Sequence, residues 1–165
     1  MLLKKLDRED FERQVESVHN RYVEGLNCAE RVFLSLHSLL QADIPSEAVA
    51  LLSGFGGGVG LTRDGMCGAV SGGIAGIGLI YGRRKPPMGS RERVYEVSRD
   101  FLCRFKSRFG TTLCRDLIGD LLRESTPQSE EKRKERCLQY TLNAAKLCID
   151  TLMKYEKMYA LESNL

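Results

Sequence analysis

Six cysteines have the clearest chemical capacity in this chain of 165 residues. A cysteine thiolate is both a strong nucleophile and a soft metal ligand, so a group of cysteines can exchange disulfides or bind zinc, copper(I) or an iron–sulfur cluster. The spacing CxxC does not occur, which disfavours a zinc ribbon and a thioredoxin-type site. The sequence also lacks CxxCH and so gives no support for c-type haem.

Three of the cysteines are predicted to lie where a helix begins. Cys28 follows the capping residue Asn27, Cys67 follows a turn-forming Arg-Asp-Gly, and Cys114 follows two threonines. Unpaired N–H groups and the positive end of the helix dipole favour a thiolate at such positions. We expect a lowered pKa for Cys67 in particular, and Arg115 to favour the thiolate of Cys114.

The other three cysteines are separated by their places on predicted helices. Cys103 lies away from the apolar stripe of its helix and has no indicated role. Cys137 and Cys148 are eleven residues apart, about 16 Å along a helix, so they cannot share one compact site. Cys148 fits the apolar stripe and reads as a small core residue, which leaves Cys137 as the fourth candidate.

The elements that would position these cysteines are all helical. Apolar residues recur at helical spacing, and there is neither strand-like alternation nor an internal repeat. The predicted helices span residues 7–24, 27–40, 47–52, 66–81, 90–109, 113–118 and 127–159. His19 lies beside the apolar stripe of the first and is expected at the surface or at a cap. The expected fold is an all-α, single-domain bundle, residues 1–165, around a buried glycine-rich helix.

That central helix, residues 66–81, contains five glycines, which together oppose helix formation by roughly 4–5 kcal/mol. Gly68, Gly72 and Gly76 share one face and would let another backbone come close. A membrane span is disfavoured because the uncharged run is shorter than the roughly 20 residues needed, and Arg83-Arg84-Lys85 ends it.

A second glycine-rich segment, residues 53–60, invites comparison with phosphate-binding loops. No strand pattern precedes it and no Gly-Lys-Ser/Thr follows, which disfavours a nucleotide site. The glycines are expected to let the chain pass tightly over the central helix. Gly56, Gly57 and Gly58 are the candidate cofactor-binding residues, since their amides could face sulfur or a small anion.

The composition of the chain bears on its cellular location and on the partners it could bind. The net charge of +3 gives no reason to expect binding to nucleic acid. Charged residues occur near the N-terminus before any apolar run of signal-peptide length, so a cytosolic protein is expected. Six cysteines in a reducing compartment are more consistent with thiols, metal ligands or redox pairs than with structural disulfides. Long apolar stripes on the first and last helices allow a homodimer. No hydrolase triad or paired-carboxylate site is visible, so enzymatic activity is left open.

The order of motifs resembles a known family. These motifs are Cys28, Gly-Phe-Gly-Gly-Gly-Val-Gly, Cys67-Gly-Ala-Val-Ser-Gly, Phe-Gly-Thr-Thr-Leu-Cys114-Arg-Asp-Leu-Ile-Gly and Cys137. Together they resemble the redox-active family labelled by its pattern C_GCAxxG_C_C over about residues 20–150, although the central segment here reads Cys-Gly-Ala. The resemblance implies a small, cytosolic, helical protein that does redox work through Cys28, Cys67, Cys114 and Cys137. The family is also similar to part of the split-Soret cytochromes, which implies an iron–sulfur centre but, without the attachment signature, no haem.

Three functions remain open from the sequence. The first is a four-cysteine site, Cys28, Cys67, Cys114 and Cys137, that binds an iron–sulfur cluster or other metal. The second uses the same residues without metal to exchange electrons with an unidentified redox partner, Cys67 attacking and Cys28 or Cys114 resolving. The third is a helical interaction module with structural cysteines; binding of a small molecule at the glycine loop is a lesser alternative.

Overall fold

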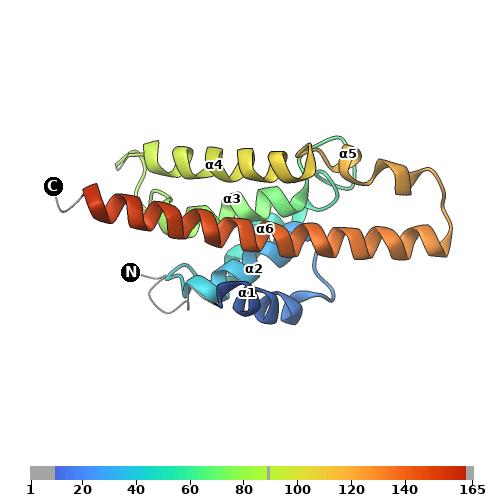
Figure 1. The fold of residues 1–165 in the computed structure, drawn as a ribbon, viewed down its shortest axis with the longest axis horizontal. Helices are drawn as coiled ribbons and strands as arrows, with labels where there is room; N and C mark the ends of the chain where they lie inside the picture. The colour runs from blue at the N-terminus through green and yellow to red at the C-terminus, as the bar shows by residue number, and fades with distance from the viewer. Residues whose placement is uncertain (1–9, 89, 163–165) are drawn as a thin grey trace.

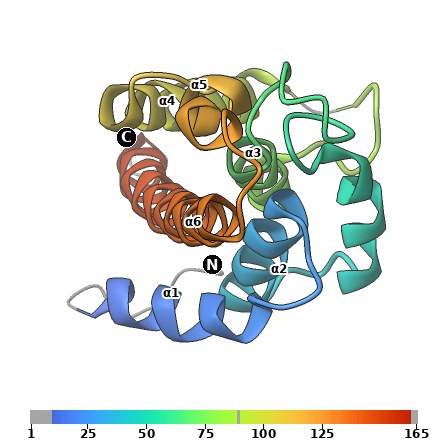
Figure 2. The same ribbon diagram turned by 90° about the vertical axis from the view of Figure 1, so that its right-hand side faces the viewer.

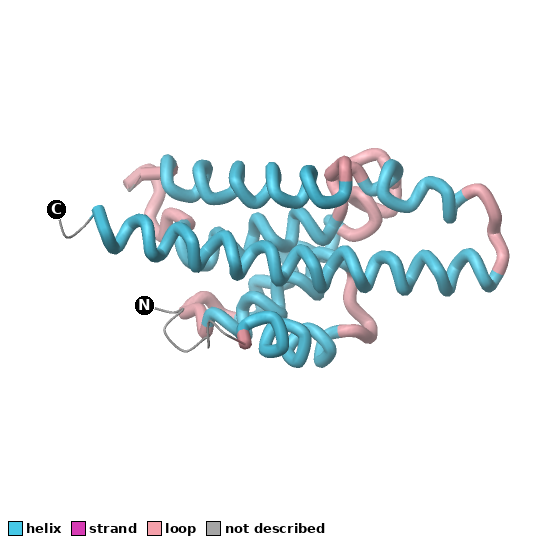
Figure 3. Tube along the Cα trace, in the orientation of Figure 1, coloured by secondary structure: helices cyan, strands magenta, loops and turns pink. Residues whose placement is uncertain are grey.

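The computed structural model describes residues 10–88 and 90–162 of the chain. Its elements are α1 (Phe11–His19), η2 (Asn20–Tyr22), α2 (Cys28–Leu40), η3 (Ser46–Phe55), α3 (Gly68–Tyr81), α4 (Glu92–Phe109), α5 (Cys114–Ile118), η4 (Gly119–Leu122) and α6 (Pro127–Glu162). The described part contains no strand, only an isolated antiparallel bridge between Met66 and Leu113 (Figure 3). The predicted all-α fold is confirmed.

The long helix α6 runs the length of the molecule, and the other helices pack along it (Figure 1). Viewed end-on, α6 has α4, α3, α2 and α1 arranged around it (Figure 2). The glycine-rich helix α3 contacts α2, α4 and α6, so it lies at the centre of this arrangement. One continuous hydrophobic core joins buried side chains from all of these helices.

The shared glycine face of α3 packs against α2, as the sequence predicted. A Cβ added at Gly72 would lie 2.5 Å from the carbonyl oxygen of Ala29, and one at Gly68 would lie 2.9 Å from the Cβ of Cys28. Because the neighbour of Gly72 is backbone, no side-chain movement could make room for a methyl group. The tight α2–α3 contact offsets the low helix propensity of the glycines.

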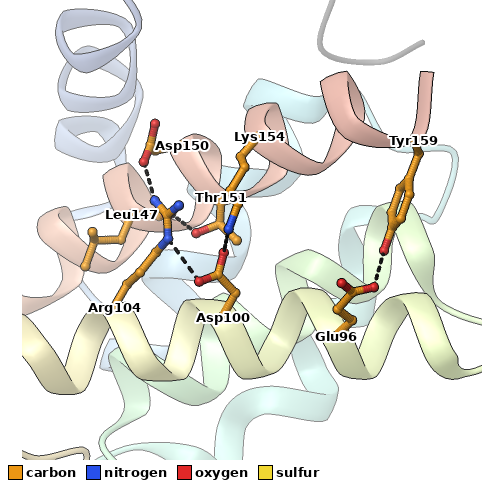
Figure 4. Close-up of polar contacts among 8 residues, drawn as sticks. All are labelled: Glu96, Asp100, Arg104, Leu147, Asp150, Thr151, Lys154 and Tyr159. Atoms are coloured by element: carbon orange, nitrogen blue, oxygen red, sulfur yellow. Dashed lines mark hydrogen bonds and ion pairs between the residues drawn. The ribbon is translucent and has the colours of Figure 1, made fainter. Parts of the chain in front are cut away.

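Polar contacts fasten α4 to α6 on the outer side of the core (Figure 4). Arg104 of α4 donates to Asp150 at 2.5 Å, and Lys154 of α6 donates to Asp100 at 2.8 Å. Further along, the Tyr159 hydroxyl donates to Glu96 at 2.9 Å. These partly exposed contacts set the register between two helices whose apolar faces supply most of the binding energy.

The chain departs from the predicted first helix after His19. Arg31 of α2 donates to the carbonyl oxygens of Tyr22 at 2.8 Å, Val23 at 2.5 Å and Leu26 at 3.2 Å. These bonds turn the chain around a buried guanidinium, so α1 ends early. Residues 7–9 of that predicted helix, and the N-terminal residues behind the cytosolic expectation, lie outside the described part.

The segment predicted as a short α-helix at 47–52 is a longer 3₁₀-helix, η3. The side-chain amide of Asn27 donates to the carbonyl oxygens of Leu52 and Ser53, which tethers the end of η3 to the start of α2. Among the described helices, none is both long and apolar enough to cross a bilayer.

Candidate functional site: a cluster of four thiols

Cys28 is the first residue of α2, as predicted. Asn27 caps this helix by accepting from the amides of Ala29 at 2.8 Å and Glu30 at 3.0 Å, while the Glu30 carboxylate accepts from the Asn27 amide. Because Asn27 engages these two amides, the amide that can still act on the Cys28 sulfur is that of Cys28 itself, which makes a small contribution.

Backbone hydrogen bonds join the segment that ends at Cys67 to the segment that ends at Cys114. Cys67 was predicted inside the first turn of α3 but is the N-cap of that helix, and its amide donates to the carbonyl oxygen of Thr112 at 2.8 Å. Cys114 begins α5, and its amide donates to the carbonyl oxygen of Gly65 at 3.1 Å. The starts of two helices far apart in the sequence therefore meet.

The glycine loop covers this junction rather than lying along α3. Residues 57–61 all have positive φ, including Val59 at 64° and Leu61 at 63°, so the loop makes a left-handed turn. Its carbonyl groups at Gly56, Gly57 and Gly58 accept from amides farther along the loop. A Cβ at Gly58 would lie 2.7 Å from the Cβ of Cys114, so only glycine fits there.

Cys137 lies on α6 and meets Cys28 at a pocket of about 530 Å³. Both cysteines line this pocket, together with Gly56 and Gly57 of the loop. Cys67 and Cys114 are buried behind it, at 6% and 5% exposure. The structure thus arranges the four predicted cysteines as a pair at a pocket and a pair beneath it.

The two pocket thiols have opposite pKa shifts. A hydrogen bond with Cys137 lowers the pKa of Cys28 from its ordinary value near 9 to about 7; burial opposes this shift, and the charges of Arg31 and Arg63 assist it. The same hydrogen bond, together with burial, raises the pKa of Cys137. The pair therefore titrates as a unit, and the positive charges of Arg31 and Arg63 favour Cys28 as the member that ionises first.

The expected low pKa of Cys67 is wrong. The nearby amides of Ala69 and Val70 act to lower it, as its place at a helix start suggested, but burial outweighs them and raises the pKa of Cys67 to about 12. Negative charge on Cys28 or Cys114 raises it further. Burial likewise raises the pKa of Cys114. A helix N-terminus could not compensate for removal of these two sulfurs from water.

Two arginines near the cluster were not identified from the sequence. Arg63 stands at positive φ, 67°, and its guanidinium is hydrogen-bonded to Cys114. Arg31 is 8% exposed and acts on both Cys28 and Cys137. Arg115, the cation expected beside Cys114, instead forms an ion pair with Asp64. Arg31 lies away from the apolar stripe of its predicted helix, so the sequence pattern gave no signal for it.

The two remaining cysteines lie away from the cluster. Cys103 is exposed on α4, and Cys148 is fully buried on α6, where its thiol donates to the carbonyl oxygen of Gly73 at 3.5 Å. Burial raises the pKa of Cys148. Its assignment as a core residue is confirmed. All six cysteines are free thiols.

The sequence profile of one family matches residues 26–151, and its description reads "Putative redox-active protein (C_GCAxxG_C_C)". The chain belongs to this family. The match spans all four clustered cysteines. Searches for similar curated proteins and similar solved structures found no match.

Among the residues described, no three or more histidine, cysteine, aspartate or glutamate side chains are arranged to hold a metal ion. Cys28 and Cys137 line the pocket, whereas Cys67 and Cys114 are buried and do not line it. In this arrangement, the two cysteines that line the pocket, Cys28 and Cys137, are the ones accessible for thiol–disulfide exchange.

Proposed function

We propose that this protein is a dithiol–disulfide redox protein in which Cys28 is the attacking thiol and Cys137 the resolving thiol. The observation that carries the proposal is that these two cysteines, 109 positions apart in the chain, line the same pocket and act on each other's ionisation. Exchange requires an attacking thiolate, a second thiol within reach of the mixed disulfide, and access for the partner. The pair satisfies all three requirements.

The reaction balances without a bound cofactor. The Cys28 thiolate attacks one sulfur of a partner disulfide, forming a mixed disulfide and releasing one partner thiolate. The Cys137 thiol then loses its proton to solvent and attacks the sulfur of Cys28, which releases the second partner thiolate. The partner gains two electrons, and the protein retains a Cys28–Cys137 disulfide.

The experiment that tests the proposal is trapping of the mixed disulfide. The Cys137→Ser variant should accumulate a mixed disulfide on Cys28 when treated with a small disulfide, whereas Cys28→Ser should accumulate none at the pocket. Cys103→Ser is the matched control, because Cys103 is exposed but distant, and it should form the Cys28–Cys137 bond normally. Peptide mapping that located the first adduct on Cys67 or Cys114 would contradict the assignment.

A metal-bound form is the alternative chemistry for the same cysteines. If the cysteines bind metal, protein purified without oxygen should contain iron and acid-labile sulfide, or another metal. An iron–sulfur cluster would also absorb light between 300 and 600 nm. Stoichiometric metal bound through Cys28 and Cys137 would contradict the free dithiol. If the protein is instead an interaction module, replacing all four clustered cysteines by alanine should leave partner binding unchanged.

Three narrower expectations belong to this proposal: a cytosolic location, an electron-transfer partner and a homodimer. Location is checked by fractionation of cells producing the untagged chain. Light scattering on the purified protein gives the number of chains per particle. Disulfide capture of cellular proteins by the Cys137→Ser variant identifies the partner, provided that Cys28→Ser does not capture the same proteins.

A further inference from the structure

The pocket at the Cys28–Cys137 pair carries an excess of positive charge. Four cationic residues line it against two carboxylates, Glu131 and Glu135. The cationic residues are Arg31, Arg63, Arg133 and Lys134. They come from α2, the glycine loop and α6, so positive charge reaches the pocket from three sides. A ligand that enters it meets a net positive field close to the reacting sulfurs.

The cations differ in what they can do. Arg31 is committed to three backbone carbonyl groups, so it supplies a fixed charge rather than a mobile donor. Arg63 is half-buried and directed toward Cys114. Arg133 and Lys134 lie in the first turns of α6, four and three residues before Cys137, and can reach a ligand from the opposite wall.

The rest of the lining is compact and largely apolar. Gly56 and Gly57 present backbone without side chains, and Leu26, Leu61 and Leu138 complete the wall. A volume of about 530 Å³ is in the range of sites for small organic molecules and peptides of a few residues. It is too small for a folded protein domain, although a protein segment could enter it.

We infer that this pocket binds low-molecular-weight disulfides that carry carboxylate groups, and that these are the substrates of the Cys28–Cys137 pair. The inference rests on the proposed function. The carboxylates would lie toward Arg133 and Lys134 while the disulfide sulfur faces Cys28. One such disulfide and the two protein thiols give two molecules of the small thiol and one protein disulfide, which balances electrons and protons.

The test compares three small disulfides of similar length and different charge. They are 3,3′-dithiodipropionate, which is anionic, bis(2-hydroxyethyl) disulfide, which is neutral, and cystamine, which is cationic. Each rate is divided by the rate of the same compound with a free small thiol, which removes differences in leaving-group pKa. At low ionic strength this relative rate should be at least about tenfold higher for the anionic than for the cationic compound, because a positive cleft raises the local concentration of anions. The difference should shrink as salt is added.

Two double variants distinguish the effect of charge at the pocket from the effect of the protein's net charge. Arg133→Gln combined with Lys134→Gln should reduce the preference for the anionic disulfide several-fold. The matched control, Lys132→Gln combined with Lys157→Gln, removes two charges from exposed positions of the same helix that do not line the pocket, and should keep the preference. Both variants lie on exposed or half-exposed helix positions, and circular dichroism checks that each folds.

The outcomes distinguish this inference from the proposed function. If none of the three compounds oxidises the Cys28–Cys137 pair, the proposed function fails. If all three react at equal relative rates, the dithiol function stands and the anionic substrate class is overturned. Equal loss of preference in the pocket and control variants also overturns the inference, because overall charge would then explain the preference.

Discussion

The pKa of Cys28 depends more on a neighbouring side chain than on its position at the start of a helix. Its place at the start of α2 was visible in the sequence, but the adjacent amides are engaged by Asn27. The thiolate is instead favoured by the thiol of Cys137, 109 positions further along the chain, with support from Arg31 and Arg63. The relevant interaction is therefore tertiary.

Replacing Cys137 should change the ionisation of Cys28 in a way that depends on the replacement. Cys137→Ala removes the neighbouring thiol that favours the thiolate, so the pKa of Cys28 should rise from about 7 by at least about one unit, and its reaction at pH 7 should slow by at least about fivefold. Cys137→Ser keeps a donor and should retain most of the low pKa. The measurement is the rate of Cys28 alkylation by iodoacetamide from pH 5 to 10. The same rise in both variants would show that the donor is not the cause.

His19 was expected at the surface or at a helix cap; it is the last residue of α1 and is buried against α6. It is 2% exposed, and its Nε2 lies 2.9 Å from the Thr141 hydroxyl. Burial lowers its pKa to about 4; positive charge on Arg31 and Lys146 adds to the effect, and Asn20 and Glu16 oppose it. The sequence could not reveal this burial, because α6 lies more than a hundred residues away.

The low pKa of His19 predicts a loss of stability in mild acid. The unfolded chain binds the proton near pH 6.5 and the folded chain only near 4, so stability is full above pH 6.5 and falls as the pH decreases toward 4. From pH 7 to 5 the free energy of unfolding should fall by about 2 kcal/mol, measured by urea denaturation. His19→Gln cannot titrate and should lose most of this dependence. An unchanged slope in the variant would assign the effect to other groups.

At the scale of elements, the glycine face of α3 is the feature that the sequence predicted best. Spacing by four residues placed Gly68, Gly72 and Gly76 on one face, and the structure packs that face on α2. The spacing could not identify which helix would occupy the face. That choice depends on complementary side chains such as Leu36, which fills the space beside Gly76.

Two substitutions on α3 should have opposite effects on stability. Gly72→Ala places a methyl group against the backbone of Ala29, and should lower the free energy of unfolding by about 2–3 kcal/mol. Gly78→Ala is the matched control, since nothing outside its own helix lies within 4 Å of the added carbon. It should stabilise the protein by up to about 1 kcal/mol, because alanine favours helix. Chemical denaturation measures both, and a neutral Gly72→Ala would show that α2 and α3 can separate freely.

Most helix positions followed from local pattern, and the departures have tertiary causes. Caps and apolar spacing located α2, α5 and α6 closely, with Pro127 at the first position of α6. The end of α1 depends on Arg31, and η3 on Asn27, which are contacts between segments. The left-handed turn of the glycine loop includes Val59 and Leu61, residues that rarely take positive φ, and nothing local predicts it.

At the scale of the whole molecule, α6 connects the candidate site to the core. Its N-terminal half presents Cys137 to the pocket, and its C-terminal half is fastened to α4 by the contacts of Figure 4. The four cysteines that the sequence selected lie on α2, α3, α5 and α6, and they are brought together only when these helices pack. Their selection was accessible from the sequence, but their division into an accessible and an enclosed pair was not.

Oxidation of the pocket pair should therefore stabilise the whole fold. A Cys28–Cys137 bond would link α2 to α6 and close a loop of about 110 residues, for which loop-closure entropy allows up to about 4–5 kcal/mol. At roughly 2–4 °C per kcal/mol for a chain of this size, Tm should rise by several degrees on oxidation. Calorimetry of the oxidised and reduced protein measures this difference.

The Cys28→Ser variant supplies the control for that measurement. It cannot form the bond, so its Tm should be the same with and without oxidant, whereas Cys103→Ser should show the full increase. A lower Tm on oxidation of the unaltered chain would mean that the bond strains the packing of α2 on α6. The pocket pair would then be held apart in the native fold, and thiol–disulfide exchange at this site would require the two helices to move.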